Sequence, residues 1–324
     1  MHAEVTSDSY CFSDLEKEWV DLLQKAHTNH LFQTPQFLEA WWENFGDGEL
    51  NIYLVKDGDN HLRGVFPLSF KDGVLQALAS KEVSDYFDFI VDRDDTHAIF
   101  EAFFLEVKKN SLVQKIELLS IPDGSSTLTE MAQHGTAVIS QQTVCPVIEL
   151  PATWEEYLTS IGKKQRHEIK RKWKNLEENT QSIFSVVDSV ENIDRDVADF
   201  IRLHKSSSPE KAAFWNEKQT TYFSQIVTAA AKNTWLKLFF LETNGQRSAT
   251  MLCFEYRQRL YLFNSGYDPT TFAHLSVGNV LTSYTIKDAI ERGLKCYDFL
   301  RGDEEYKFRY RAIAEPIFDV TFSL

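Results

Sequence analysis

The chain has 324 residues, more than a single hydrophobic core usually accommodates, so its length favours two domains. Its apolar fraction of 43% and charged fraction of 25% are those of ordinary globular proteins. The 34 basic and 48 acidic residues give a net charge of −14, which argues against a general DNA-binding or RNA-binding surface and against adhesion to anionic lipid.

The N-terminal residues show no basic and then apolar pattern, and no apolar run approaches the ~18 residues of a membrane span. Cysteines occur without C-x-x-C spacing, so we expect buried free thiols rather than disulfides or zinc ligands; they are Cys11, Cys145, Cys253 and Cys296. We therefore expect a cytoplasmic protein with no transmembrane segment and no metal. No feature of the sequence indicates an oligomeric state.

The first half begins with two helical patterns and continues with hairpins. Apolar spacing predicts helices at 12–29 and 35–45, the second opened by a proline. Three strands separated by turns that contain glycine follow, at 51–56, 62–70 and 74–79. Asp85 and Tyr86, taken alone, favour a turn with a buried tyrosine. A strand ending at Val91 comes next, and then a helix and two strands, at 96–109, 115–120 and 143–150.

A basic segment joins the two halves. Residues 163–174 form the one strongly basic stretch of an acidic protein, and their spacing predicts a helix after a shorter one at 154–161. A charged linker helix is one interpretation. The other is capture of an anionic substrate or a cofactor phosphate by Arg166 and Arg171, because a guanidinium group suits bidentate phosphate binding.

The second half repeats the layout of the first. Helices are predicted at 194–205 and 216–232, around a loop at 209–215, and strands at 235–242, 248–256 and 260–264. Pairing Leu50 with Leu236, an offset of 186 residues, keeps the apolar pattern in phase through Phe70 and Tyr256. The alternatives are two copies of one unit or two unrelated meanders. His204 is predicted as a surface or capping residue rather than a proton carrier.

The stretch from Lys295 to Lys307 combines a short strand, predicted at 296–300, with a loop that begins at Arg301-Gly302. This loop concentrates acids, bases and a phenol, and is either a solvated loop or a site. Upstream, Ser276 is a predicted N-cap of a helix that stops at Gly293. The small residues at its start leave backbone N–H groups that can bind an anion.

At these residues the chain resembles the acetyltransferases related to CelD, within the Fem-like double-GNAT superfamily. The motifs that carry the resemblance are Asn264-Ser-Gly-Tyr-Asp-Pro269, the Ser-x-Gly helix start, and Asp298-Phe-Leu-Arg-Gly-Asp-x-x-Tyr-Lys307. Phe32-Gln-Thr-Pro-Gln-Phe37 and the basic helix are similar to the family's entry and linker segments, so the resemblance covers most of the chain. Val277 departs from the family pattern, which has proline there.

The resemblance implies an α+β fold of two tandem GNAT-like (acyl-CoA N-acyltransferase) domains, with mixed, mostly antiparallel sheets flanked by helices. The expected divisions are an N-terminal half at 1–150, a basic helical linker at 151–180, and a C-terminal half at 181–324 that carries the site. The implied activity is acyl transfer, as an N-acetyltransferase. An acetyl group would pass from acetyl-CoA to an amine or hydroxyl by direct attack in a ternary complex. The acceptor would be a small molecule or a saccharide of polysaccharide or cell-envelope metabolism.

Roles are assigned on residue type and on proximity in the sequence. Asp298 or Glu305 is the candidate base and Tyr306 the candidate acid. The donor's pyrophosphate is expected at the helix start, with added charge from the loop, through Ser276, Val277, Gly278, Asn279, Arg301 and Lys307. Candidate substrate contacts are Asp85, Tyr86, Arg166 and Arg171.

Two other functions share this fold. A Fem-like enzyme would take an aminoacyl group from tRNA and add it to a peptidoglycan precursor, and only this alternative involves tRNA. The charge of −14 and the single modest basic helix argue against it. The second is a binding module without catalysis. No DNA partner is expected under any of these functions.

Overall fold

The computed structural model describes residues 1–324 and divides them into two compact units. Unit 1 comprises residues 1–144 and 315–324, and unit 2 comprises residues 145–314. The elements of unit 1 are β1 (His2–Thr6), α1 (Cys11–Asp14), α2 (Glu16–Leu23), η1 (Leu31–Gln33), α3 (Pro35–Phe45), β2 (Glu49–Lys56), β3 (Leu62–Lys71), β4 (Val74–Ala77), β5 (Ile90–Val91), α4 (Thr96–Val107), β6 (Lys115–Pro122) and α5 (Ser126–Gln133).

Two strands, β7 (Thr136–Glu149) and β13 (Ile313–Ser323), contribute residues to both units. The remaining elements belong to unit 2: α6 (Trp154–Ser160), α7 (Lys163–Asn179), β8 (Ser182–Val187), α8 (Ile193–Ser207), α9 (Pro209–Phe214), α10 (Glu217–Lys232), β9 (Leu236–Thr243), β10 (Gln246–Tyr256), β11 (Arg259–Tyr267), η2 (Ala273–Leu275), α11 (Val277–Glu291), β12 (Cys296–Asp298) and α12 (Glu305–Arg309). No helix of the structure combines the length and apolar character needed to cross a membrane.

The two units have the same strand order. In unit 1 it is β1-β2-β3-β4-β6-β13, and in unit 2 it is β8-β9-β10-β11-β12 followed by the end of β7. Each unit contains one parallel pair, β4 with β6 and β11 with β12, among antiparallel neighbours. The predicted internal repeat and the mostly antiparallel α+β fold are therefore confirmed.

The closing strand of each sheet comes from the other half of the sequence. Residues 317–323 of β13 pair with β6 in unit 1, and residues 147–149 of β7 pair with β12 in unit 2. The units thus differ from the expected halves, since the C-terminal residues 315–324 belong to unit 1. The sequence did not predict β13 because a register shift between Phe318 and Val320 interrupts its two-residue alternation.

The expected linker is part of unit 2 rather than a separate segment. The Tyr157 hydroxyl in α6 donates a hydrogen bond to the Tyr310 carbonyl at 2.9 Å, and burial raises the pKa of that phenol well above its usual range. In α7, Trp173 Nε1 donates to Ser283 Oγ of α11 at 2.7 Å. These contacts bind both helices to the core of the second unit.

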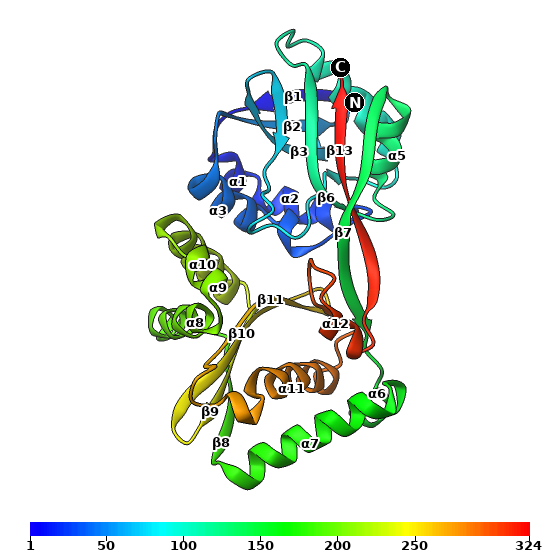
Figure 1. Cartoon of the computed structure of the whole chain (residues 1–324). Helices are drawn as coiled ribbons and strands as arrows, with labels where there is room; N and C mark the ends of the chain where they lie inside the picture. The colour runs from blue at the N-terminus through cyan, green and yellow to red at the C-terminus, as the bar shows by residue number, and fades with distance from the viewer. The chain divides into compact units, whose positions relative to one another are not determined.

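Helix α11 lies on one face of the unit 2 sheet and α8 to α10 lie on the other (Figure 1). Its buried apolar side chains, which pack with those of β9 to β11, are Val277, Val280, Leu281, Ile286, Ala289 and Ile290. Full burial of a large aliphatic side chain contributes roughly 1.5–3 kcal/mol, so the start of α11 is held firmly against the sheet.

Candidate active site

Strand β11 diverges from its parallel neighbour after three residue pairs. The pairing runs from Arg259 with Cys296 to Tyr261 with Asp298, whereas β11 continues to Tyr267 with β10 as its partner. A bulge at Phe263, between the Cys253 and Leu252 pairs of β10, adds one residue to β11. Because bulges bend a strand, this irregularity accounts for the divergence, and it leaves an edge of β11 that no strand covers.

The start of α11 offers free backbone donors. The N–H groups of Val277, Gly278 and Asn279 make no hydrogen bond, and the Ser276 side chain, whose residue has a φ of 55°, does not cap the helix. The first turn contains no acidic residue. Unpaired N–H groups at a helix start attract anions, so this site suits a phosphate. The Tyr310 hydroxyl donates to the Asn279 carbonyl at 3.3 Å and so links α11 to the segment after α12.

Asp298 and Lys307 both hold the turn that follows β12. Asp298 is fully buried; its Oδ2 accepts from Arg259 at 2.8 Å and its Oδ1 from the Leu300 N–H at 2.8 Å. Leu300 has a φ of 56°, a conformation that costs about 1–3 kcal/mol and persists only where the surrounding structure imposes it. The buried Lys307 ammonium donates to three successive carbonyls of this turn, at residues 300, 301 and 302, over 2.9–3.2 Å.

These contacts correct two of the expected roles. A carboxylate that is fully buried and paired with an arginine, as Asp298 is, is not presented to a substrate amine. The Lys307 ammonium also pairs with Glu304 at 2.8 Å, so its donors are engaged and none is left for a donor phosphate. In this structure both residues shape the loop. Arg301, the other expected source of charge, lies partly buried in the same turn.

Glu305 and Tyr306 begin α12 in different environments. The Glu305 side chain is 84% exposed and pairs with Arg309 at 2.9 Å, which makes it a surface ion pair of the helix rather than a positioned base. Tyr306 packs edge-on against Phe299, with ring centroids 6.1 Å apart. Burial first, and the Glu304 carboxylate second, raise the pKa of Tyr306 to about 12, so its phenol is protonated at neutral pH and can donate.

His204 connects α8 to β11. Trp215 Nε1 donates to His204 Nδ1 at 2.9 Å, so the ring proton lies on Nε2 and is donated to Asn264 Oδ1 at 2.8 Å. Burial, and then the positive charge of Lys211, lower the pKa of His204 to about 4. The predicted surface position of His204 is wrong, since the ring is buried and neutral. It orients the Asn264 amide, whose Nδ2 donates to no group in the structure.

Lys211, in α9, is the residue that the sequence analysis missed. Its ammonium donates to the Ser265 carbonyl of β11, just past the bulge. Burial lowers the pKa of Lys211, and the Glu304 carboxylate opposes that shift. Gly266 makes the close approach of α8 possible, because a Cβ there would lie 2.4 Å from the backbone nitrogen of His204. A cation with a lowered pKa therefore sits at the uncovered end of β11.

The four residues that were expected to contact the substrate lie elsewhere in the chain. Arg166 donates to the Leu158 carbonyl at 3.1 Å, and Arg171 makes two hydrogen bonds to Glu168, at 3.1 and 2.9 Å. Asp85 and Tyr86 belong to unit 1, where the Tyr86 ring stacks on His30 with centroids 5.3 Å apart. Unit 2 thus brings together the α11 start, the turn after β12 and the end of β11.

Comparison with known proteins identifies this part of the chain. The family model of the acetyltransferase (GNAT) domain matches residues 163–308, all of which lie within unit 2. Residues 163–308 thus match the GNAT domain family. The predicted acyltransferase is thereby confirmed at the level of the domain family. A search of curated proteins found no match.

Solved structures extend the likeness to the whole chain. FemX has a TM-score of 0.70 at 12% identity, over 100% of this chain and 98% of its own. L-PGS from Bacillus licheniformis has a TM-score of 0.60 at 11% identity, over 94% and 91%. A tandem GNAT protein from the clavulanic acid biosynthesis pathway has a TM-score of 0.53 at 9% identity, over 99% and 98%. At these identities the likeness concerns the fold, and it confirms the tandem-GNAT, Fem-like architecture. The nearer resemblance to acetyltransferases related to CelD stays a prediction.

Proposed function

We propose that the GNAT domain of unit 2 binds an acyl-CoA, most simply acetyl-CoA, and transfers its acyl group directly to an amine or hydroxyl acceptor. The observation that carries this proposal is the pairing of two features within the domain. One is the set of three unengaged N–H groups at the start of α11, and the other is the uncovered edge of β11 beyond Tyr261.

The two features suit the two ends of the donor. The N–H groups of Val277, Gly278 and Asn279, next to Ser276, would hold the pyrophosphate of coenzyme A. Arg301 stays a candidate for additional positive charge. The pantetheine arm contains amide groups, which can hydrogen-bond to a strand edge as another strand would. This arrangement would carry the thioester from Tyr267, which lies beside Gly278, back along β11 towards the bulge, where Asn264 lies and Lys211 contacts Ser265.

The reaction then needs no covalent enzyme intermediate. The acceptor nitrogen or oxygen attacks the thioester carbonyl, the new bond to the acyl carbon forms, and the carbon–sulfur bond breaks. The Asn264 amide and the Lys211 ammonium would stabilise the charge that develops on the carbonyl oxygen. Tyr306 remains the candidate that protonates the departing thiolate, and the proton lost by the acceptor balances this transfer.

The acceptor is proposed from the family resemblance. An amino sugar or another intermediate of polysaccharide or cell-envelope metabolism fits the implied class. Fem-like aminoacyl transfer to a peptidoglycan precursor is the alternative, and the basic residues of α7 are the feature that would serve a polyanionic donor. Two of them, Arg166 and Arg171, already bond within the chain, which favours the acyl-CoA donor.

Calorimetric titration of acetyl-CoA into the full chain tests the proposal. A matched pair of variants isolates the start of α11. Gly278→Ala adds a Cβ that meets the Tyr267 ring at an ordinary 3.6 Å and keeps the N–H group, so its affinity should equal that of the wild type. Gly278→Asp places a carboxylate against the phosphates, although acidic residues favour a helix start, and should weaken binding at least about tenfold.

Three outcomes are decisive. Saturable binding that only Gly278→Asp weakens supports the donor and its position. Equal affinity in all three proteins removes the α11 start as the phosphate site. If the wild type does not bind acetyl-CoA and retains tRNA through purification, the donor is aminoacyl-tRNA instead.

A further inference from the structure

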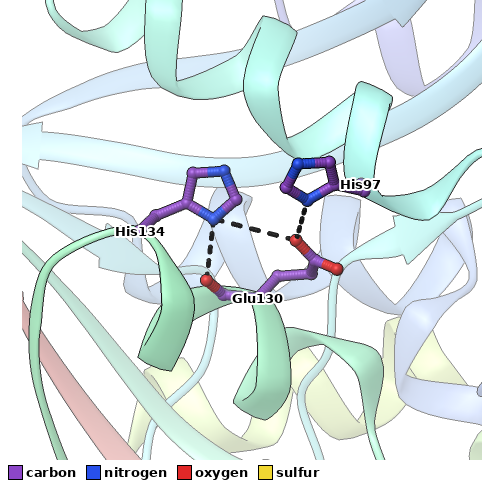
Figure 2. Close-up of side chains that lie close together, drawn as sticks. All are labelled: His97, Glu130 and His134. Carbon is purple, nitrogen blue, oxygen red and sulfur yellow. Dashed lines mark hydrogen bonds and ion pairs between the residues drawn. The ribbon is translucent and has the colours of Figure 1, made fainter.

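Two histidines and a glutamate from α4 and α5 converge on one point in unit 1 (Figure 2). His97 Nδ1 lies 3.0 Å from Glu130 Oε2, and His134 Nδ1 lies 3.7 Å from the same oxygen. The three ligand atoms all lie within 4.8 Å of one another. None of these residues belongs to the GNAT domain matched at 163–308.

Local structure explains the convergence. Glu130 and His134 are four residues apart at the end of α5, where that spacing puts both on one side of the helix. His97 is the second residue of α4 and faces them. The Glu130 carbonyl, an acceptor at the end of α5, also points at His134 Nδ1 over 2.9 Å. Carbonyl groups at a helix C-terminus favour a cation nearby.

Oxygen acceptors surround both ring nitrogens of His134, an environment that favours a cation. Its Nδ1 faces the Glu130 carbonyl and carboxylate, and its Nε2 lies 2.8 Å from Glu101 Oε1. A neutral imidazole has one N–H, so it can donate to only one of these two sides. If Nε2 donates to Glu101, the lone pair of Nδ1 is left among oxygen atoms, where a metal ion would bind it. A carboxylate behind a histidine is the usual support of a metal ligand.

The distances and exposure fit such an ion. A tetrahedral zinc site with bonds of about 2.0–2.1 Å separates its ligand atoms by about 3.3 Å, which the observed 3.0 and 3.7 Å bracket. The Phe104 ring stacks on His134 with centroids 4.7 Å apart and fixes its plane. The His97 side chain is 65% exposed, whereas those of Glu130 and His134 are 10% and 11% exposed, so water can reach the ion from the His97 side.

We propose that unit 1 binds a divalent transition-metal cation, with Zn²⁺ the best match, through His97 Nδ1, Glu130 Oε2 and His134 Nδ1. Imidazole and carboxylate ligands suit zinc, and three protein ligands leave a fourth position for water. The ion joins α4 to α5 and so stabilises unit 1. No metal was expected from the sequence, because the cysteines lack ligand spacing and the two histidines are brought together only by the packing of α4 on α5.

A second group of potential ligands serves as the control. Asp57, Asp59 and His61 lie within reach of one another in the turn between β2 and β3. Asp57 Oδ1 already accepts the N–H groups of Asp59 and His61, each at 3.0 Å, which is the pattern of a turn that needs no ion. His61→Ala is therefore matched to His97→Ala in chemistry and exposure.

The test uses the full chain without a polyhistidine tag, stripped with EDTA and titrated with Zn²⁺ against a chromophoric chelator. The wild type and His61→Ala should bind one Zn²⁺ per chain with the same affinity. His97→Ala, an exposed change that leaves the fold intact, should weaken that binding by about 100-fold. Glu130→Gln should do the same. Zn²⁺ should raise the melting temperature of the wild type and leave that of His97→Ala unchanged.

Two results would overturn the proposal. One is equal Zn²⁺ affinity in the wild type and His97→Ala, which would put the ion elsewhere. The other is a wild type that gains no thermal stability from Zn²⁺, which would leave the contacts among His97, Glu130, His134 and Glu101 as the account of this cluster. Neither result bears on acetyl-CoA binding by unit 2, which is measured separately.

Discussion

The same stretch of sheet is completed differently in the two units. In unit 1, Gly64 of β3 pairs with Val91 of the two-residue strand β5. In unit 2, the corresponding Thr250 of β10 pairs with Gly266, near the end of the long strand β11. Strand β5 thus takes the place of the second part of β11, and the chain between β4 and β5, residues 78–89, is an insertion into that strand.

The inserted segment is anchored inside unit 1. Its Asp88 carboxylate is buried and accepts from Thr28 at 2.6 Å and from Thr127 at 2.5 Å, and burial raises the pKa of that carboxyl. Tyr86 stacks on His30 in the segment between α2 and α3. In unit 2 the segment between α8 and α10 supplies Lys211 instead. In unit 1, side chains of residues 78–89 therefore fill the region that corresponds to the polar end of β11 in unit 2.

The helix starts differ in charge as well. Three aspartates, Asp92, Asp94 and Asp95, precede α4 directly, whereas no acidic residue lies in the first turn of α11. Negative charge at a helix start stabilises the helix and repels a phosphate. Two copies of one fold thus keep the same strand order, while only unit 2 keeps a helix start without acidic residues that suits a phosphorylated donor.

The largest effect should follow from removing the Lys211 charge. Lys211→Met should lower turnover about 100-fold, because it removes a cation beside the developing oxyanion, and should leave acetyl-CoA affinity within about twofold. The control is Lys25→Met, an exposed lysine in the corresponding segment of unit 1. Thiol release from acetyl-CoA with a panel of amino sugars and amines measures both. Full activity in Lys211→Met would remove this difference between the units.

The next effect concerns stability. Lys307→Met should lower the free energy of unfolding by about 3 kcal/mol, because three carbonyls and Glu304 lose a charged donor. Lys295→Met, at an exposed position, should change it by less than about 0.5 kcal/mol. Urea midpoints at constant slope give the values. A variant with unchanged stability and weakened acetyl-CoA binding would restore Lys307 as a phosphate contact.

The pH dependence of stability should show the buried neutral His204. Its pKa in the folded protein, about 4, lies below the unfolded value of 6.5, so the unfolded state binds more protons between these limits. The stability that it contributes is complete above pH ~6.5 and is lost as the pH falls towards 4. Between pH 7.5 and pH 5 this loss is about 2 kcal/mol.

His204→Gln provides the comparison for that measurement. The variant should be less stable at pH 7.5, since the contact between α8 and β11 is weakened, but its stability should fall less steeply down to pH 5. Urea unfolding of both proteins across this range isolates the contribution of His204. Parallel slopes would mean that the ring is already charged or exposed in the folded protein.

The smallest effect is expected at Glu305. Glu305→Ala removes an exposed ion pair with Arg309, and should change the free energy of unfolding by less than about 0.5 kcal/mol and leave turnover unaltered. A fall in turnover of tenfold or more would return Glu305 to the role of base and shift the proposed chemistry from the β11 end to α12.

The sequence predicted regular elements well where one period was uninterrupted. Helix α3 begins at Pro35 and ends at Phe45 as predicted, and α11 follows Ser276 as predicted. Strand β13 was missed because its bulge breaks the alternation. Helix α9 was predicted as a loop, although Ser208 followed by a proline is a start signal, and the Ser208 hydroxyl does accept the Lys211 N–H.

The candidate site was predictable in its location but not in its partners. The anion-binding start of α11 and the charged turn after β12 could be found from local patterns. The partners of Asp298 and Lys307 could not, because their burial depends on tertiary packing with Arg259 and with the turn carbonyls. Lys211 lies 54 residues before Ser265, the residue that it contacts, and no local period connects two such positions.

Hydrogen–deuterium exchange with and without acetyl-CoA tests the central claim most directly, because it examines both units in one experiment. The account predicts slower exchange at residues 277–279 and along the end of β11, and no change at the start of α4 or in residues 78–89. Protection at the start of α4, or equal protection in the two units, would contradict the assignment of the donor site to unit 2.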